Sequence, residues 1–210
     1  MNTFIEIPAG KNSISNRKLV FGVGVNDSNY TVTSRSTENK QIMCPFYKRW
    51  KGMIGRCYSS KFHEKQSTYK DCAVADEWLT FSVFKSWMIN EDWQDKELDK
   101  DLLVPGNKIY SPDTCIFISP ELNTLLRDCK SARGRWPIGV NFDKQSGKFR
   151  AQCNIKGKSK KLGRFASPED ASQTYRVFKS NHIKEIAKGY ENNNRLYRSL
   201  LLHAKLVWTL

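Results

Sequence analysis

Six acidic side chains gather in the stretch EDWQDKELDKD, residues 91–101, of an otherwise basic chain. Two of them, Asp99 and Asp101, flank Lys100. Because strand side chains alternate, an extended 98–102 segment would point both carboxylates the same way. Carboxylate oxygens suit hard divalent cations, and Mg²⁺ commonly takes one or two of them together with substrate phosphate and water. The spacing predicts a Mg²⁺ or Mn²⁺ site, with a charged, solvent-facing strand end as the alternative.

The overall charge favours a polyanionic partner. The 210 residues hold 35 Lys and Arg against 21 Asp and Glu, a formal net charge of +14. Each cation set against a phosphate releases a condensed counterion, so nucleic acid is the first candidate and an anionic membrane surface the second. The sequence has no apolar run of about 18 residues and no secretory leader pattern. We therefore expect no membrane partner.

Positive charge is concentrated between residues 130 and 165, which hold eleven Lys or Arg and one acid. With aromatic residues interleaved, this segment suits a β-ribbon set into a DNA groove. Most of its cations would contact phosphates, and Arg150 and Arg164 are candidates for reading guanine. The alternatives are a solvated basic surface and RNA binding by stacking aromatics. The expected DNA contacts are Arg135, Lys148, Arg150, Lys158, Lys160, Lys161 and Arg164, with Lys48, Arg49 and Arg56 from a basic helix face upstream.

The elements that must position these residues can be predicted from apolar spacing and turn residues. Helical periodicity predicts helices over 44–60 and 76–88, with a polar loop over 59–72 between them. The acidic stretch is followed by a Pro-Gly-Asn turn, a β-rich run over 114–118, and a helix opened by Ser119 and Pro120. This order is a ββα unit of about 30 residues.

After a linker at 127–137 the pattern changes to three short strands, PIGVNF, KFRAQCNI and KSKKLGRF. A helix from Ser167 to about residue 187 follows them. Residues 191–208 form a last amphipathic helix that either packs back on the core or mediates a homodimer. The fold class is therefore α+β, a helix-rich domain followed by a small three-stranded sheet plus helix.

The six cysteines are scattered and include no C-x-x-C pair. Disulfide frameworks belong to small secreted domains, so we expect reduced thiols in a cytosolic protein. The spacing also argues against a structural zinc site.

The combination of motifs resembles a known family. CPFYKRWKGMIGRCYS, DEWLTFSVFKSWM and LDKDLLVPGNKIYSPDTC, with GVGVNDSNY before them, resemble HNH-type (ββα-metal) homing endonucleases of tailed phages. GVNFDKQSGKFRAQCNIKGKSKKLGRFASPEDASQTY resembles the DNA-binding domain of plant ethylene-response factors, which also accompanies such phage nucleases. The resemblance covers residues 19–189.

The resemblance and the predicted elements together divide the chain into three parts: an HNH-like nuclease domain over 1–128, a basic βββα DNA-binding domain over 129–189, and the C-terminal helix over 190–210. It implies metal-dependent, site-directed hydrolysis of phosphodiester bonds in double-stranded DNA by a phage-encoded protein acting in the host cytoplasm. Asp99 and Asn123 carry over as metal ligands and Asn107 as the residue that shapes the loop. Asp101 is a substitute ligand.

One position departs from the family pattern. The motif has a histidine after the first-strand aspartate, which acts as general base, and Lys100 stands at that position here. A lysine flanked by acids stays protonated, so Lys100 is a poor base, although it could hold the phosphate or stabilise charge. Water activation would then fall to the metal or to His63, for which an exposed loop position is the alternative. A catalytically inactive DNA-binding protein, a repressor or decoy, is the alternative function.

Overall fold

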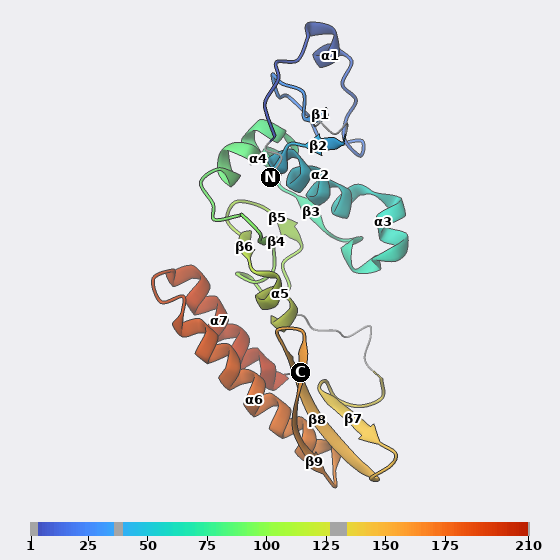
Figure 1. Cartoon of the computed structure of the whole chain (residues 1–210), viewed down its shortest axis with the longest axis vertical. Coiled ribbons are helices and arrows are strands. Elements are labelled where there is room, and N and C mark those ends of the chain that lie inside the picture. The colour runs from blue at the N-terminus through green and yellow to red at the C-terminus, as the bar shows by residue number, and fades with distance from the viewer. Residues whose placement is uncertain (1–3, 36–39, 127–133, 210) are drawn as a thin grey trace. The chain divides into compact units, whose positions relative to one another are not determined.

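The computed structural model describes residues 4–35, 40–126 and 134–209 (Figure 1). The protein is mixed α+β. It divides into two compact units, Met1–Phe117 and Ile118–Leu210. The division falls before the helix that ends the ββα segment, whereas the expected boundary lay after it, at 128/129. Of the expected linker at 127–137, residues 127–133 lie outside the described residues.

The first unit combines short helices with two-stranded sheets. Its helices are α1 (Lys11–Ser15), α2 (Pro45–Tyr58), α3 (Ser60–Lys65) and α4 (Phe81–Met88), with 3₁₀ turns at Ser67–Tyr69 and Asp76–Leu79. Its strands are β1 (Thr33–Arg35), β2 (Gln41–Met43), β3 (Ala73–Val74), β4 (Glu97–Asp99), β5 (Ile109–Tyr110) and β6 (Ile116–Ile118). β1 pairs with β2 antiparallel, β3 pairs with β5 parallel, and β4 pairs with β6. The strand–loop–strand–helix order predicted from residue 98 onward is present, with β5 as an unexpected addition.

The core of this unit forms between α2 and the segment that ends in α4. Trp50 of α2 is fully buried, and its indole N–H donates to the Trp78 carbonyl at 2.7 Å. Phe81 and Phe84 are also fully buried. The helix predicted over 44–60 is confirmed, because its apolar stripe is the stripe that packs into this core.

Two predictions about this unit are wrong in detail. Residues 76–88 are not one helix, because Thr80 is extended and bridges Val25, which separates the 3₁₀ turn from α4. Residues 59–72 are not a loop, since they contain α3 and a 3₁₀ turn. The Ser59 hydroxyl caps α3 by accepting from the Phe62 N–H, a local bond that polar composition alone does not reveal.

The second unit is a three-stranded sheet backed by a long helix (Figure 1). Its elements are α5 (Pro120–Leu126), β7 (Val140–Asp143), β8 (Lys148–Ile155), β9 (Lys158–Phe165), α6 (Pro168–Lys188), α7 (Asn194–Leu206) and a final 3₁₀ turn, Val207–Thr209. The strands are antiparallel in the order β7–β8–β9. The predicted βββα order is confirmed.

Close packing joins the sheet to α6. Val140 and Ala151 on the sheet and Ala171 on the helix form a small buried cluster. Gly139 has φ +77°, and a Cβ there would lie 2.1 Å from the Tyr175 ring. Only glycine permits both this backbone conformation and this approach, so the strand and helix meet at a position that admits no side chain.

The last helix packs back on α6. Leu196, Leu200 and Ala204 of α7 are buried, and the Ser180 hydroxyl of α6 donates to the Ala204 carbonyl at 2.8 Å. Trp208, at the end of the amphipathic helix predicted over 191–208, lies in the final 3₁₀ turn and is 44% exposed. Dimerisation through this segment stays a prediction. None of the helices in the described part of the chain is long and apolar enough to cross a membrane.

The five described cysteines are buried, and none of them is in a disulfide. Burial raises the pKa of the Cys57 and Cys115 thiols to about 12. A thiol with so high a pKa is an inert core group at neutral pH. Cys129 lies outside the described residues.

Candidate metal site and candidate nucleic-acid interface

The Asp99 carboxylate organises a tight turn at the end of β4. Its Oδ1 accepts the backbone N–H of Asp101 at 3.0 Å and that of Leu102 at 2.7 Å. The condition under which both carboxylates would point the same way, an extended 98–102 segment, is not met, because the strand ends at Asp99 and an Asx-type turn follows. The turn, rather than strand alternation, decides where the two carboxylates of the segment lie.

Asp99 and Asp101 influence one another within this turn. Burial and then the charge of Asp101 raise the pKa of the Asp99 carboxyl to about 6, while the two backbone N–H groups oppose the rise. A half-buried carboxylate beside a second acid is costly to ionise unless a cation neutralises it. The pair is thus a favourable place for a cation.

Lys100 occupies the position where the family motif has histidine. Its side chain is buried, and Nζ lies 3.1 Å from the Asp101 Oδ2 and 5.9 Å from the ring centroids of Tyr69 and Tyr110. Burial lowers the pKa of the ammonium, but the charge and hydrogen bond of Asp101 outweigh burial, and the net pKa is raised. An ammonium held in this way is protonated at neutral pH and cannot accept a proton from water.

Asn107 ties the two ends of the following loop together. Its Nδ2 donates to the Lys100 carbonyl at 2.7 Å and to the Ile109 carbonyl at 2.6 Å, and its Oδ1 accepts the Ile109 N–H at 3.2 Å. The turn before it is closed by the Asn107 N–H donating to the Val104 carbonyl at 3.0 Å, with Gly106 at φ +81°. These bonds hold the backbone of the turn that carries the acidic residues.

Asn123 lies in the middle of α5. The Ser119 hydroxyl accepts the Leu122 N–H at 3.2 Å, as expected for the cap of this helix. Asn123 belongs to the second unit and Asp99 to the first. Joint metal ligation by Asn123 and Asp99 stays a prediction.

His63 is neither exposed nor in a loop. It is a half-buried residue of α3, and its Nε2 lies 2.9 Å from the Arg56 carbonyl. The ring nitrogen that faces a carbonyl must donate, which leaves only Nδ1 as a base. The exposed-loop alternative is wrong because Ser59 nucleates a short helix there.

Arg56 is turned toward the core rather than outward with the other cations of α2. Its guanidinium lies 5.3 Å from the Tyr110 ring centroid, and its Nε is buried without a hydrogen-bond partner. Both Arg56 and Asp99 affect the pKa of the Cys115 thiol, Asp99 by raising it and Arg56 by lowering it. Arg56 therefore lies in the neighbourhood of the acidic turn. Lys48, in contrast, is exposed on α2 as expected, and Arg49 is half-buried.

The donor set suits a single hard cation that is shared with a substrate. Within the described ranges, no group of three or more His, Cys, Asp and Glu side chains could hold a metal ion. A nuclease Mg²⁺ needs only one or two carboxylates, because phosphate and water complete its shell. Asp99 is suited to be the first carboxylate ligand because its pKa is raised. Asp101 can offer the cation a carboxylate oxygen only while its carboxylate also pairs with Lys100.

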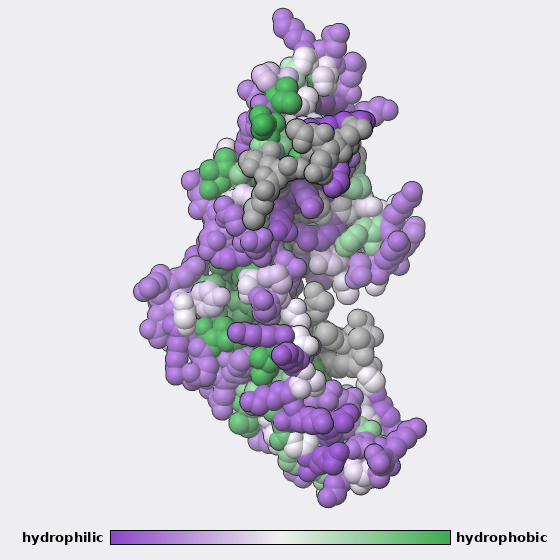
Figure 2. Space-filling model, in the orientation of Figure 1, coloured by the Kyte–Doolittle hydropathy of each residue, from purple (hydrophilic) through white to green (hydrophobic). Residues whose placement is uncertain are grey.

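The basic residues of the sheet lie on two different sides. Directly opposed residues share a face, and Arg150 stands opposite Arg164 and also opposite Asn141. Residues at every second position from Arg150 on β8, together with the residues opposite them on β7 and β9, occupy the side of the sheet away from α6. We call this side the open face. Its members are Asn141, Asp143, Lys148, Arg150, Gln152, Asn154, Ser159, Lys161 and Arg164. Figure 2 shows a mostly hydrophilic surface over these strands.

Two arginines lie directly opposite one another on the open face. Arg150 and Arg164 are cross-strand neighbours, and a carboxylate, Asp143, lies 3.4 Å from the Arg164 guanidinium. The Arg150 Nε is buried without a hydrogen-bond partner. Like charges directly opposite one another destabilise a sheet, so an anion on this face would relieve a cost that the free protein carries.

Strand register identifies two polar residues that charge counting missed. Asn141 and Gln152 lie on the open face beside the arginines. Side-chain amides of this kind can pair bidentately with adenine. The sequence shows that Gln152 lies two residues from Arg150 and Asn141 two residues from Asp143, so each shares a face with that charged residue. A β-bulge between Ala151 and Gln152, however, shifts the register with β9. The residues of β9 that lie opposite them could therefore not be predicted from the sequence.

Lys158 and Lys160, expected among the DNA contacts, point toward α6. Lys160 stands opposite the buried Cys153, and its Nζ lies 4.8 Å from the ring centroid of Phe178 on α6. Lys158 is two residues away on the same strand and therefore on the same side. Arg135 is exposed, with its guanidinium 4.4 Å from the Trp136 ring centroid.

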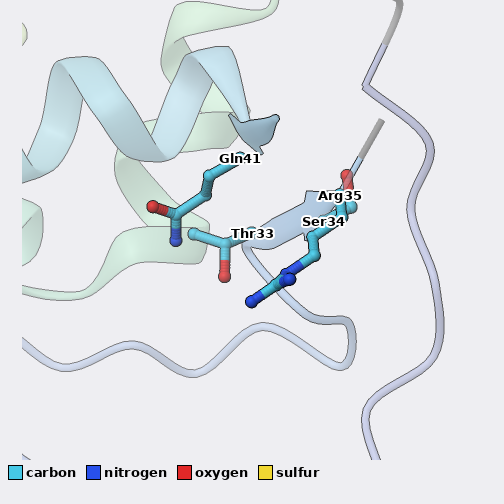
Figure 3. Close-up of a pocket in the computed structure, with 4 residues that line it drawn as sticks. All are labelled: Thr33, Ser34, Arg35 and Gln41. Atoms are coloured by element: carbon cyan, nitrogen blue, oxygen red, sulfur yellow. The ribbon is translucent and has the colours of Figure 1, made fainter. Parts of the chain in front are cut away.

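A cavity of about 420 Å³ lies at the β1–β2 hairpin, lined by Thr33, Ser34, Arg35 and Gln41 (Figure 3). None of these residues was predicted to act in binding or catalysis, and none belongs to the acidic turn. Among the described residues, its lining offers no pair of carboxylates. The cavity is therefore separate from the candidate metal site.

In comparisons with protein-family models, with curated proteins and with solved structures, no match to this chain was found.

Proposed function

We propose that this chain is an HNH-like, metal-dependent endonuclease that cleaves double-stranded DNA. The single observation that carries the proposal is the acidic turn, in which Asp99 and Asp101 lie together on a loop tied by Asn107. The raised pKa of Asp99 supports a cation site, and the sequence resemblance supports the reaction class.

The roles follow from the contacts. A Mg²⁺ bound here would stabilise negative charge on the scissile phosphate and acidify a water. Asp99 would hold the ion, and Asn107 keeps the turn in shape. Lys100 is not the base; its ammonium balances Asp101 and adds positive charge next to an incoming phosphate. The open face of the sheet supplies DNA affinity through Arg150, Arg164 and their neighbours.

The test is cleavage of supercoiled plasmid and of a phage-genome library with Mg²⁺ or Mn²⁺. Asp99→Asn is the informative variant, since asparagine keeps the Oδ1 acceptor of the turn but loses the charge. Asp92→Asn, which changes an exposed acid of the same acidic stretch, is the matched control. We expect cleavage by the wild type and the control, loss with Asp99→Asn, and loss with a chelator. Intact DNA in every arm would refute the nuclease proposal.

A second function, DNA binding without cleavage, is favoured by one observation. The Lys100 ammonium is buried, paired and protonated, so the residue at the histidine position cannot activate water. A repressor or decoy would shift DNA on a gel in the experiment above but leave it uncut with either metal.

A further inference from the structure

A second basic surface lies at the β8–β9 turn, on the side of the sheet that α6 covers. We call it the turn edge, and its members are Lys156, Lys158, Lys160 and His182. The three lysines are exposed, and His182 is a half-buried residue of α6. The turn itself is tight, because Lys156 has φ +48° and Gly157 has φ +75°. No Asp or Glu occurs between residues 144 and 168.

An aromatic ring holds two of these groups together. The Lys160 Nζ lies 4.8 Å from the centroid of Phe178. The imidazole of His182 stacks on the same ring, with centroids 5.9 Å apart and planes 19° from parallel. The cation–π contact therefore holds the Lys160 ammonium at the ring that the imidazole also contacts, instead of leaving it to sample solvent.

This arrangement disfavours a charged imidazole in the unliganded protein. Burial first, and then the charges of Lys160 and Lys156, lower the pKa of His182. The nearest acid on the same helix, Glu185, pairs with Lys188 at 2.8 Å. An anion placed between the lysines and the imidazole would reverse the repulsion and favour a protonated His182.

We propose that the turn edge binds one backbone phosphate of DNA, with Lys156 and Lys160 as its charged ligands and His182 taking up a proton as the phosphate binds. The inference rests on the proposed binding of DNA by the open face. The same two strands carry both surfaces, and a ribbon in a groove places its turn beside the phosphates that border the groove. Phosphate is the fitting occupant because compact ammonium groups bind it as point charges.

The first experiment measures the salt dependence of binding of the full chain to a 30-base-pair duplex of mixed sequence. An Asp99→Asn background prevents cleavage and removes the titration of that carboxyl. We expect Lys156→Gln and Lys160→Gln each to make the slope of log K against log salt shallower, and the double variant to make it shallower by about 0.9, the share of one phosphate. Lys188→Gln, a cation of α6 already paired with Glu185, should leave the slope unchanged. Lys156 lies in an exposed turn, so its variant tests the idea even where Lys160→Gln disturbs the packing on Phe178.

The second experiment follows protonation of His182. We expect its pKa, measured by NMR, to rise when the duplex is added, and affinity to increase severalfold between pH 7.5 and pH 6. His182→Gln should abolish the increase. Inorganic phosphate at equal ionic strength should not reproduce it; if it does, the edge binds free anions and the DNA assignment is wrong.

An Arg150→Gln arm separates two kinds of failure. If Arg150→Gln weakens binding while the turn-edge variants leave slope and pH dependence unchanged, the turn edge does not contact DNA and only this inference fails. If neither set of variants changes binding, the proposed DNA binding by the second unit fails as well.

Discussion

The buried Lys100 ammonium lies 3.1 Å from the carboxylate of Asp101, its neighbour in sequence, and 5.9 Å from the ring centroids of Tyr69 and Tyr110. The pair neutralises one of the two acids of the turn and leaves Asp99 as the carboxylate with a raised pKa. This division of roles has consequences for the pH dependence of the proposed reaction.

Cleavage should rise with pH through about 6, because Asp99 must lose its proton before it can hold a metal ion. The midpoint should move to lower pH as the metal concentration increases, since metal and proton compete. Lys100→Gln should lower the rate but keep the ionisation, because the ammonium does not act as base. Its midpoint should not move to lower pH, since the charge of Asp101 beside Asp99 is then no longer compensated. A pH–rate profile of both proteins checks this, and loss of the ionisation in Lys100→Gln would contradict it.

Asp99→Asn should stabilise the metal-free protein at neutral pH. The pKa of Asp99 is about 6 in the folded chain against an ordinary value of 3.8, so the native state binds more protons between these values. Stability therefore falls as pH rises from about 4 to about 6 and then levels off. Asp99→Asn has no carboxyl to ionise at this position. Its free energy of unfolding should therefore exceed that of the wild type by up to about 3 kcal/mol above pH 6 and should equal it near pH 3. Denaturant unfolding at both pH values is the measurement. Equal gains at both would point to a cause other than ionisation.

Asn107→Ala should destabilise the first unit by about 2 kcal/mol, because the backbone carbonyls of Lys100 and Ile109 each lose a hydrogen-bond donor. Asn107→Asp is the matched variant, since it preserves shape and the acceptor for the Ile109 N–H but cannot donate. Both should unfold at lower denaturant than the wild type. If Asn107→Asp unfolds at the same denaturant concentration as the wild type, the two donated bonds do not hold the loop.

Arg150→Gln should weaken DNA binding without weakening the fold. Removing one of two opposed cations relieves repulsion from Arg164, so the free energy of unfolding should stay the same or rise by about 0.5 kcal/mol. Loss of a bidentate base contact should cost about 1–3 kcal/mol of binding to a preferred sequence. Lys144→Gln in the exposed β7–β8 turn is the control. Titration of a selected duplex and thermal unfolding measure the two effects, and parallel losses would mean that Arg150 is structural.

Local patterns were enough to predict most elements. The stripe of Tyr47, Trp50 and Met53 marks α2 because residues three and four apart share a helix face. Strand composition and the Lys156–Gly157 turn predict β8 and β9, since both depend on neighbouring residues only. Ser119 and Ser167 identify helix starts because a cap bonds within its own first turn.

Non-local partners decided the rest. Thr80 breaks a predicted helix because Val25, distant in sequence, offers it a strand bridge. Asp99, in contrast, starts its turn through local bonds, because its Oδ1 accepts the N–H groups of Asp101 and Leu102.

The sequence by itself determined which residues could do chemistry: an acidic pair, a lysine where a base is expected, and a dense set of cations. Only the tertiary structure decided which cations act together. It placed Arg150 and Arg164 on the open face and Lys160 against Phe178, because register, a bulge and the packing of α6 assign each side chain to one side of the sheet. Charge is counted along a chain, but a binding surface forms from residues that the fold turns the same way.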